Sequence, residues 1–204
     1  MKILFLDVDG VLNIMSSSYY TYAHGIKLED HLIRRLEFIF ERVSNLYIVI
    51  SSSWRTDELM CELEKHNFKY LTKIIDRTSR EKQYRGEQIY DYIVNNDLIE
   101  NMCILEDEPD DICGTRCNKI DKEFVVRVNM EVGLSHTDTI KAIHILNEID
   151  DNRDGMDVKY TNIGYDTYIS KGYRPQVIYD PIKDNGKWKY MRLDNKNMIL
   201  HLHN

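Results

Sequence analysis

Short apolar runs alternate with segments of helical periodicity through the first 150 residues of this 204-residue chain. Five of these runs have the length and β-branched content of buried strands, and the apolar residues between them recur at helical spacing. Strands that alternate with helices form a parallel sheet. The alternation therefore predicts an α/β fold with a doubly wound parallel sheet. We expect strands at 3–6, 46–50, 73–76, 102–105 and 124–128, and helices at 28–43, 56–66, 86–95 and 135–149.

The sequence changes character near residue 150. From Val158 onward, Tyr, Val and Ile alternate with polar residues, and Asp184-Asn185-Gly186 has the composition of a hairpin turn between apolar runs at 177–179 and 188–191. We therefore expect two parts, an α/β core at 1–150 and a small β-rich C-terminal extension at 151–204. The extension could guide substrate, form a dimer or cover a sheet edge, and the sequence favours none of these roles.

Two aspartates follow the first expected strand, in Asp7-Val8-Asp9-Gly10. Ligands of open α/β sheets bind beyond the carboxyl ends of the strands, so both carboxylates should face the binding crevice. Asp7 could attack phosphorus to form an aspartyl-phosphate, and Asp9 could protonate the leaving oxygen and then activate water. Two close carboxylates also attract a cation such as Mg²⁺, which prefers oxygen ligands. The alternative is a strand-ending turn whose carboxylates cap loop amides.

The second strand ends in a run of serines, Ser51-Ser52-Ser53-Trp54-Arg55. A hydroxyl at a strand end, beside the free amides of the next helix, can hold a phosphate. We expect Ser51 to be the first phosphate ligand and Ser52 the next, and Arg55 could clamp the phosphate or the substrate. The alternative roles are an N-cap for the helix that follows and, for Arg55, a solvated side chain.

A third apolar strand leads into an acidic run, Glu106-Asp107-Glu108-Pro109-Asp110-Asp111. So many carboxylates in one place favour a bound cation, because neighbouring negative charges oppose ionisation. We expect Asp107 to join Asp7 and Asp9 as a metal ligand, with Glu106, Asp110 or Asp111 orienting it or its waters. A solvated acidic loop is the alternative.

A basic segment, residues 80–85, precedes the helix expected at 86–95. A cation from this segment could neutralise the aspartyl-phosphate and the oxygens of the attacked phosphoryl group. Arg85 is the first candidate for this catalytic role and Lys82 is the second. Either side chain could instead form a surface ion pair.

Taken in order, these four motifs resemble those of haloacid dehalogenase (HAD) superfamily phosphatases, and further details are similar to the HAD domains of RNA-repair proteins. The resemblance implies an Asp7 nucleophile, an Asp9 acid–base, a Ser51-type phosphate ligand, a basic residue and Mg²⁺. Glu106 departs from the family pattern, in which Gly or Asp is commoner, so the identity of the metal-binding acid stays open. Asp9 favours phosphoester hydrolysis, because related enzymes that are not phosphatases often lack this acid. The quoted motifs are Leu4–Asn13, Ser51–Arg55, Arg85–Glu87 and Ile104–Asp107.

Charge is distributed unevenly between the two expected parts. Residues 1–150 hold 18 basic and 27 acidic side chains, net −9, whereas residues 151–204 hold nine and seven, net +2. The extension is therefore the better candidate to contact a polyanion. The first strand begins at the N-terminus and no apolar run approaches the length of a membrane span, so we expect a cytoplasmic protein without membrane contact. The sequence indicates no oligomeric state.

The spacing of the motifs leaves little room for a large cap domain over the site. About a dozen loop residues and one helix separate the first two motifs, and about thirty residues separate the second from the third. An uncapped site suits a phosphate displayed on a macromolecule. We therefore expect a Mg²⁺-dependent phosphomonoesterase that acts on nucleic-acid ends. A phosphoprotein phosphatase, a small-nucleotide phosphatase and a non-catalytic binding or regulatory module are the alternatives.

Overall fold

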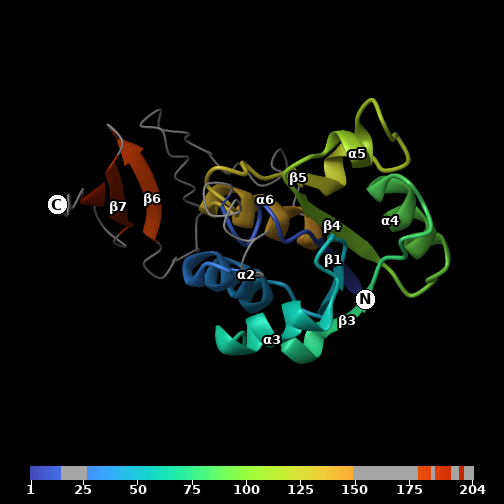
Figure 1. Cartoon of the computed structure of the whole chain (residues 1–204), viewed down its shortest axis with the longest axis horizontal. Coiled ribbons are helices and arrows are strands. Elements are labelled where there is room, and N and C mark those ends of the chain that lie inside the picture. Colours follow the sequence, from blue (N-terminus) through green and yellow to red (C-terminus); the bar gives the residue numbers. More distant parts are fainter. Residues whose placement is uncertain (15–26, 149–178, 185–186, 194–197, 200–204) are drawn as a thin grey trace. The chain divides into compact units, whose positions relative to one another are not determined.

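Figure 1 shows the computed structural model of the protein. It describes residues 1–14 and 27–148, together with the strand residues 179–184, 187–193 and 198–199 of the C-terminal part. The chain forms two compact units, Met1–Ile149 and Asp150–Asn204, which are considered separately. The loop expected between the first strand and the first helix falls largely at 15–26, outside the described residues.

Five parallel strands form the sheet of the first unit, namely β1 (Lys2–Leu6), β2 (Leu46–Ile50), β3 (Ile74–Arg77), β4 (Asn101–Glu106) and β5 (Val125–Arg127). Their order is β3-β2-β1-β4-β5. The chain therefore runs outward from β1 to β3, and then returns to the other side of β1 to form β4 and β5. The prediction of an α/β fold with a doubly wound parallel sheet is confirmed. This order creates a topological switch point between β1 and β4.

Helices cover both faces of this sheet. Ile3 and Phe5 of β1 pack on one face in a core cluster that includes Ile89 and Ile112. Leu4 and Leu6 alternate with them, so they point to the opposite face, and both are fully buried. Burial on two faces explains why the strand sequences are nearly continuous apolar runs. The helices are α2 (Asp30–Arg42), α3 (Asp57–Lys65), α4 (Arg85–Val94), α5 (Asp110–Cys113) and α6 (His136–Asn147).

All the helices and strands expected in the first unit occur, and their ends differ from the expected ones by at most two residues. The structure adds α5 and two short 3-10 turns, Leu71–Lys73 and Lys122–Phe124. Helix α5 buries Ile112 against α4, and its four residues are too few to produce a recognisable helical period. None of the described helices is long and apolar enough to cross a membrane.

The C-terminal unit contains a small antiparallel sheet. Its strands are β6 (Tyr179–Asp184), β7 (Lys187–Leu193) and β8 (Met198–Ile199), in the order β6-β7-β8. Asp184 pairs with Lys187, so β6 and β7 form the expected hairpin around residues 185 and 186. Strand β6 is described from Tyr179 onward and continues through Pro181. Since β6 is an edge strand of this sheet, Pro181 can lie in it without removing a central hydrogen bond.

Candidate active site

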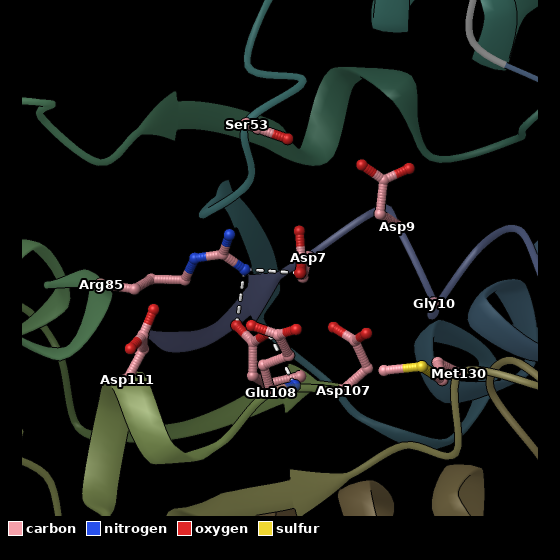
Figure 2. A pocket seen from close by; sticks show the side chains of 10 residues that line it. Asp7, Asp9, Gly10, Ser53, Arg85, Asp107, Glu108, Asp111 and Met130 are labelled. Carbon is pink, nitrogen blue, oxygen red and sulfur yellow. Dashed lines mark hydrogen bonds and ion pairs between the residues drawn. The ribbon is translucent and has the colours of Figure 1, made fainter. Parts of the chain in front are cut away.

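Acidic side chains from two neighbouring strands meet at the switch point of the sheet (Figure 2). Asp7 and Asp9 follow β1, whereas Glu106 ends β4 and Asp107 follows it. The carboxyl ends of adjacent parallel strands lie at the same edge, which explains why residues a hundred positions apart come together. A pocket opens at this edge, and its lining is mostly polar: Asp7, Asp9, Gly10, Ser53, Arg85, Glu106, Asp107, Glu108, Asp111 and Met130.

Asp7 is buried at the floor of this pocket and is paired with an arginine. Its Oδ1 accepts a hydrogen bond from the Val8 N–H at 2.7 Å, and its Oδ2 accepts one from Arg85 Nη1 at 2.5 Å. The same nitrogen donates to Glu106 Oε2 at 2.6 Å. Burial by itself would lower the pKa of Arg85, but the negative charges of Asp7 and Glu106 outweigh burial and raise it. Arg85, the first residue of α4, therefore supplies a fixed positive charge beside Asp7.

Three carboxylates could hold a metal ion here. Asp7, Glu106 and Asp107 each offer an oxygen, and these oxygens lie within 4.8 Å of one another. Burial, and then the charge of Asp7, raise the pKa of Glu106 well above its usual value and that of Asp107 to about 6. When all three acids are ionised, the guanidinium of Arg85 neutralises one of the three negative charges. A divalent cation would balance the other two. An all-oxygen donor set with this charge fits Mg²⁺.

Gly10 allows the chain that leaves β1 to pass directly against Asp107. Its φ angle is +68°, in the left-handed region that glycine adopts without strain. A Cβ atom at this position would lie 2.5 Å from Asp107 Oδ2. Any other residue at position 10 would therefore have to displace the Asp107 carboxylate.

Asp9 also faces the pocket, but its carboxylate lies outside the group of three. Its Oδ2 accepts a hydrogen bond from Trp54 Nε1 at 2.5 Å, and its Oδ1 accepts one from Asn13 Nδ2 at 2.9 Å. Figure 2 shows the Asp9 carboxylate turned away from that of Asp107. The structure thus brings Asp9 to the pocket without bringing its carboxylate into the metal-ligand set in which the sequence placed it.

Comparison with protein families supports the fold described above. A family model described as the HAD domain in Swiss Army Knife RNA repair proteins matches residues 3–139. The chain belongs to this HAD family. The match includes every residue that lines the pocket, and the family resemblance inferred from the motifs is confirmed. Comparison with curated proteins and with solved structures gave no match.

The serine run of this HAD domain follows β2 at the same edge of the sheet. Ser51 is buried, and its hydroxyl has no hydrogen-bond partner among the described residues. Ser52 is also buried, and its Oγ accepts a hydrogen bond from the Trp54 N–H at 3.2 Å. Ser53 is exposed and lines the pocket. A buried hydroxyl without a partner is uncommon in folded proteins, so Ser51 keeps an unused hydrogen bond, but neither Ser51 nor Ser52 is among the residues that line the pocket.

Arg55 does not line the pocket of the HAD domain. Its guanidinium donates to Ser52 O at 2.6 Å, to Thr78 O and Oγ1 at 2.5 and 2.8 Å, to Ser79 O at 2.9 Å and to Gln88 Oε1 at 2.9 Å. These bonds join the serine run, the end of β3 and helix α4. Arg55 is therefore placed to hold these three segments together, whereas the sequence suggested a phosphate clamp.

Two further candidates lie away from the three carboxylates. Lys82 is exposed, and its Nζ lies 3.5 Å from Asp91 Oδ2, so it forms a surface ion pair. Asp111 lines the pocket, but its Oδ1 accepts a hydrogen bond from Arg116 Nη1 at 3.1 Å and it is not one of the three clustered acids. Of the two basic candidates, the structure brings Arg85 to the pocket and leaves Lys82 outside it.

Sequence reasoning missed several residues around the pocket of the HAD domain. Trp54 and Ser53 belong to the serine run, so their proximity to the other motifs could have been inferred, but the partner of the indole N–H could not. Asn13 follows the Asp7–Asp9 motif, and its Oδ1 accepts from the Gly10 N–H at 2.9 Å. Met130 lies between β5 and α6 and has no sequence signal that points to the pocket.

We expect Arg55→Met to lower the free energy of unfolding by about 2–4 kcal/mol, because several acceptors around Arg55 lose a charged donor together. Burial, and then the positive charges of Arg80 and Arg85, lower the pKa of Arg55 to about 10, so the side chain is still charged at neutral pH. Urea denaturation of the whole chain measures the change. Arg34→Met is the matched control, because Arg34 is exposed on α2 and its loss should change stability by no more than about 0.5 kcal/mol. Equal effects of the two substitutions would contradict the structural role of Arg55.

Proposed function

We propose that this HAD domain is a Mg²⁺-dependent phosphomonoesterase that forms an aspartyl-phosphate on Asp7 and acts on the phosphate of a nucleic-acid end. The observation that carries this proposal is the surroundings of Asp7. A buried carboxylate lies at the floor of an open pocket, with the Arg85 guanidinium at 2.5 Å and two further acids within reach of the same cation. Membership of a family named for RNA repair supports a phosphorylated nucleic-acid substrate.

In the proposed reaction, Asp7 is the nucleophile and Asp9 transfers the protons. A carboxylate oxygen of Asp7 bonds to phosphorus as the bond from phosphorus to the leaving oxygen breaks, and Asp9 gives its proton to that oxygen. Asp9 then takes a proton from water, whose oxygen bonds to phosphorus as the bond between phosphorus and Asp7 breaks. Phosphate leaves, and both aspartates return to their starting states.

Three groups assist these two steps. Arg85 offers a fixed positive charge to the phosphoryl oxygens, and the free hydroxyl of Ser51 is available as a hydrogen-bond donor to them. Asp7, Glu106 and Asp107 would hold Mg²⁺, which when bound neutralises negative charge on the phosphoryl group.

A pocket that the described residues leave open, next to an exposed positive charge, supports a substrate with more than one phosphate. Between β2 and β4, the described chain forms α3, β3 and α4 of the core. It contains no inserted domain that would cover the pocket. Arg80 is exposed, and its Nη2 donates to the carbonyl oxygen of Ser53, which lines the pocket, at 2.7 Å. A neighbouring phosphate of a polynucleotide could bind there, as backbone contacts commonly position nucleic acids.

A substrate panel tests this proposal. The full chain is incubated with Mg²⁺ and either a 3′-phosphorylated RNA oligonucleotide, a 5′-phosphorylated one, a phosphopeptide or a mononucleotide, and phosphate release is measured. We expect kcat/KM to be highest for one of the oligonucleotides, and this preference to weaken as salt rises, because added salt screens contacts to the polyanion. A preference for the phosphopeptide or the mononucleotide would overturn the substrate assignment. No hydrolysis of any substrate would overturn the assignment as a phosphomonoesterase.

A further inference from the structure

The Asp9 carboxylate is held by a tryptophan that comes from the loop after the neighbouring strand. Trp54 Nε1 donates to Asp9 Oδ2 at 2.5 Å, across 45 positions of the sequence. The other oxygen, Oδ1, accepts from Asn13 Nδ2 at 2.9 Å. Both carboxylate oxygens therefore have a protein donor, while Asp9 itself lines the pocket beside Asp7 and Ser53.

We propose that Trp54 is a positioning residue that holds the carboxylate of Asp9 in the orientation needed to exchange protons with the leaving oxygen and with water. This inference rests on the proposed function, because it assigns Trp54 a task in the same two proton transfers. Trp54 acts through Asp9 and does not itself touch the reacting atoms.

The two donors fix the orientation of the Asp9 carboxylate because each of them presents only an N–H group to it. An indole N–H can only donate a hydrogen bond, so Trp54 always presents a donor to Oδ2. The side-chain amide of Asn13 could in principle flip, but its Oδ1 accepts from the Gly10 N–H at 2.9 Å, which holds the Nδ2 group toward Asp9. Asn13 is completely buried, which restricts its movement further. Each carboxylate oxygen keeps a second lone pair that can carry the transferred proton.

Trp54 also connects the acid–base residue to the serine run. Its backbone N–H donates to Ser52 Oγ at 3.2 Å, next to the free hydroxyl of Ser51. One residue thus reaches both the loop proposed to hold the phosphate and the carboxylate proposed to protonate the leaving oxygen. Their separation is thereby set within one network of hydrogen bonds, and such positioning lowers the entropic cost of bringing reacting groups together.

The role of the indole N–H can be separated from the role of the aromatic ring. Trp54→Phe keeps an aromatic ring at this position and removes the donor to Asp9. A general acid matters most when the leaving oxygen belongs to an alkyl alcohol, which departs poorly without a proton. It matters little for nitrophenyl phosphate, because nitrophenolate can leave as the anion. A purely structural defect would slow both substrates equally.

We expect Trp54→Phe to lower kcat/KM about tenfold for an alkyl phosphate, the effect of one hydrogen bond to a charged group, and at most about twofold for nitrophenyl phosphate. In an Asp9→Asn background the same substitution should cause no further loss of kcat/KM, because the two residues act together. Tyr90→Phe is the matched control and should leave both values unchanged, because Tyr90 is exposed on α4 and does not line the pocket. Equal losses on both substrates would overturn the positioning role.

A second measurement does not depend on activity. The chain has two tryptophans, so a ¹⁵N-labelled sample gives two indole N–H signals, and each single Trp→Phe variant identifies one of them. Asp9→Asn should move the Trp54 signal to lower frequency, because the bond to a carboxylate is stronger than one to an amide. An unmoved Trp54 signal would contradict the hydrogen bond. If this signal moves but the wild type hydrolyses neither phosphate, the contact stands and the proposed function is wrong.

Discussion

Asp7→Asn is expected to reduce phosphate release from an aryl phosphate by at least about 10⁴-fold, because a carboxamide cannot serve as the nucleophile. The amide has almost the size and shape of the carboxylate, and its oxygen can still accept a hydrogen bond from the Val8 N–H or from Arg85. The variant should therefore fold. Initial rates in the presence of Mg²⁺ give the loss of activity, and thermal unfolding of the same sample establishes that the loss is chemical.

Asp97→Asn is the matched control for this experiment. Asp97 is exposed in the segment after α4, so its replacement removes one negative charge without touching the pocket. Its rate should remain within a factor of two of the wild type, about the effect expected of a surface change. Near-normal activity of Asp7→Asn would exclude Asp7 as the nucleophile. An unfolded Asp7→Asn variant would instead assign Asp7 a structural role as the partner of Arg85.

Asp9→Asn is expected to slow hydrolysis by about 10²- to 10⁴-fold, the usual contribution of general acid–base catalysis. The asparagine oxygen can still accept a hydrogen bond from Trp54, so the side chain should stay near its present place, but it no longer carries a transferable proton. The loss should appear in kcat as well as in kcat/KM, because Asp9 acts in both the formation and the hydrolysis of the aspartyl-phosphate.

Steady-state kinetics on an alkyl phosphate, compared with wild type under identical Mg²⁺, measure this effect. An unchanged rate would remove Asp9 from the acid–base role. If kcat/KM falls only because KM rises, with kcat unchanged, Asp9 binds substrate and transfers no proton. Weaker uniform binding leaves kcat intact.

The fold of the first unit could be predicted from the sequence because its signals are local. Strand β2 occupies the expected residues 46–50, since an apolar β-branched run needs no distant information to be recognised. Helix α5 was missed because four residues cannot establish a period. Strand β6 was expected to end before Pro181, because a proline disfavours a strand unless the strand lies at an edge, and edge position is a property of the assembled sheet.

The candidate site could be predicted only in part. Asp7 and Asp107 follow strand ends and Glu106 is the last residue of β4, and parallel strands bring such residues together, so their proximity follows from the topology. The sequence ranked Arg85 ahead of Lys82, but it could not show that Arg85 pairs with Asp7 while Lys82 pairs with Asp91. The partners of Arg55 are residues 52, 78, 79 and 88, and nothing local indicates that one guanidinium joins them.

The most direct test of this account is to trap the phosphoryl group on the protein. The full chain, Mg²⁺ and a phosphomonoester are mixed, the reaction is quenched in acid during the first turnover, and the peptides are analysed by mass spectrometry. We predict one phosphoryl group on the peptide that contains Asp7, present in Asp97→Asn and missing in Asp7→Asn. Phosphate release without any covalent phosphate during the turnover, or with the phosphoryl group on another residue, would exclude Asp7 as the nucleophile.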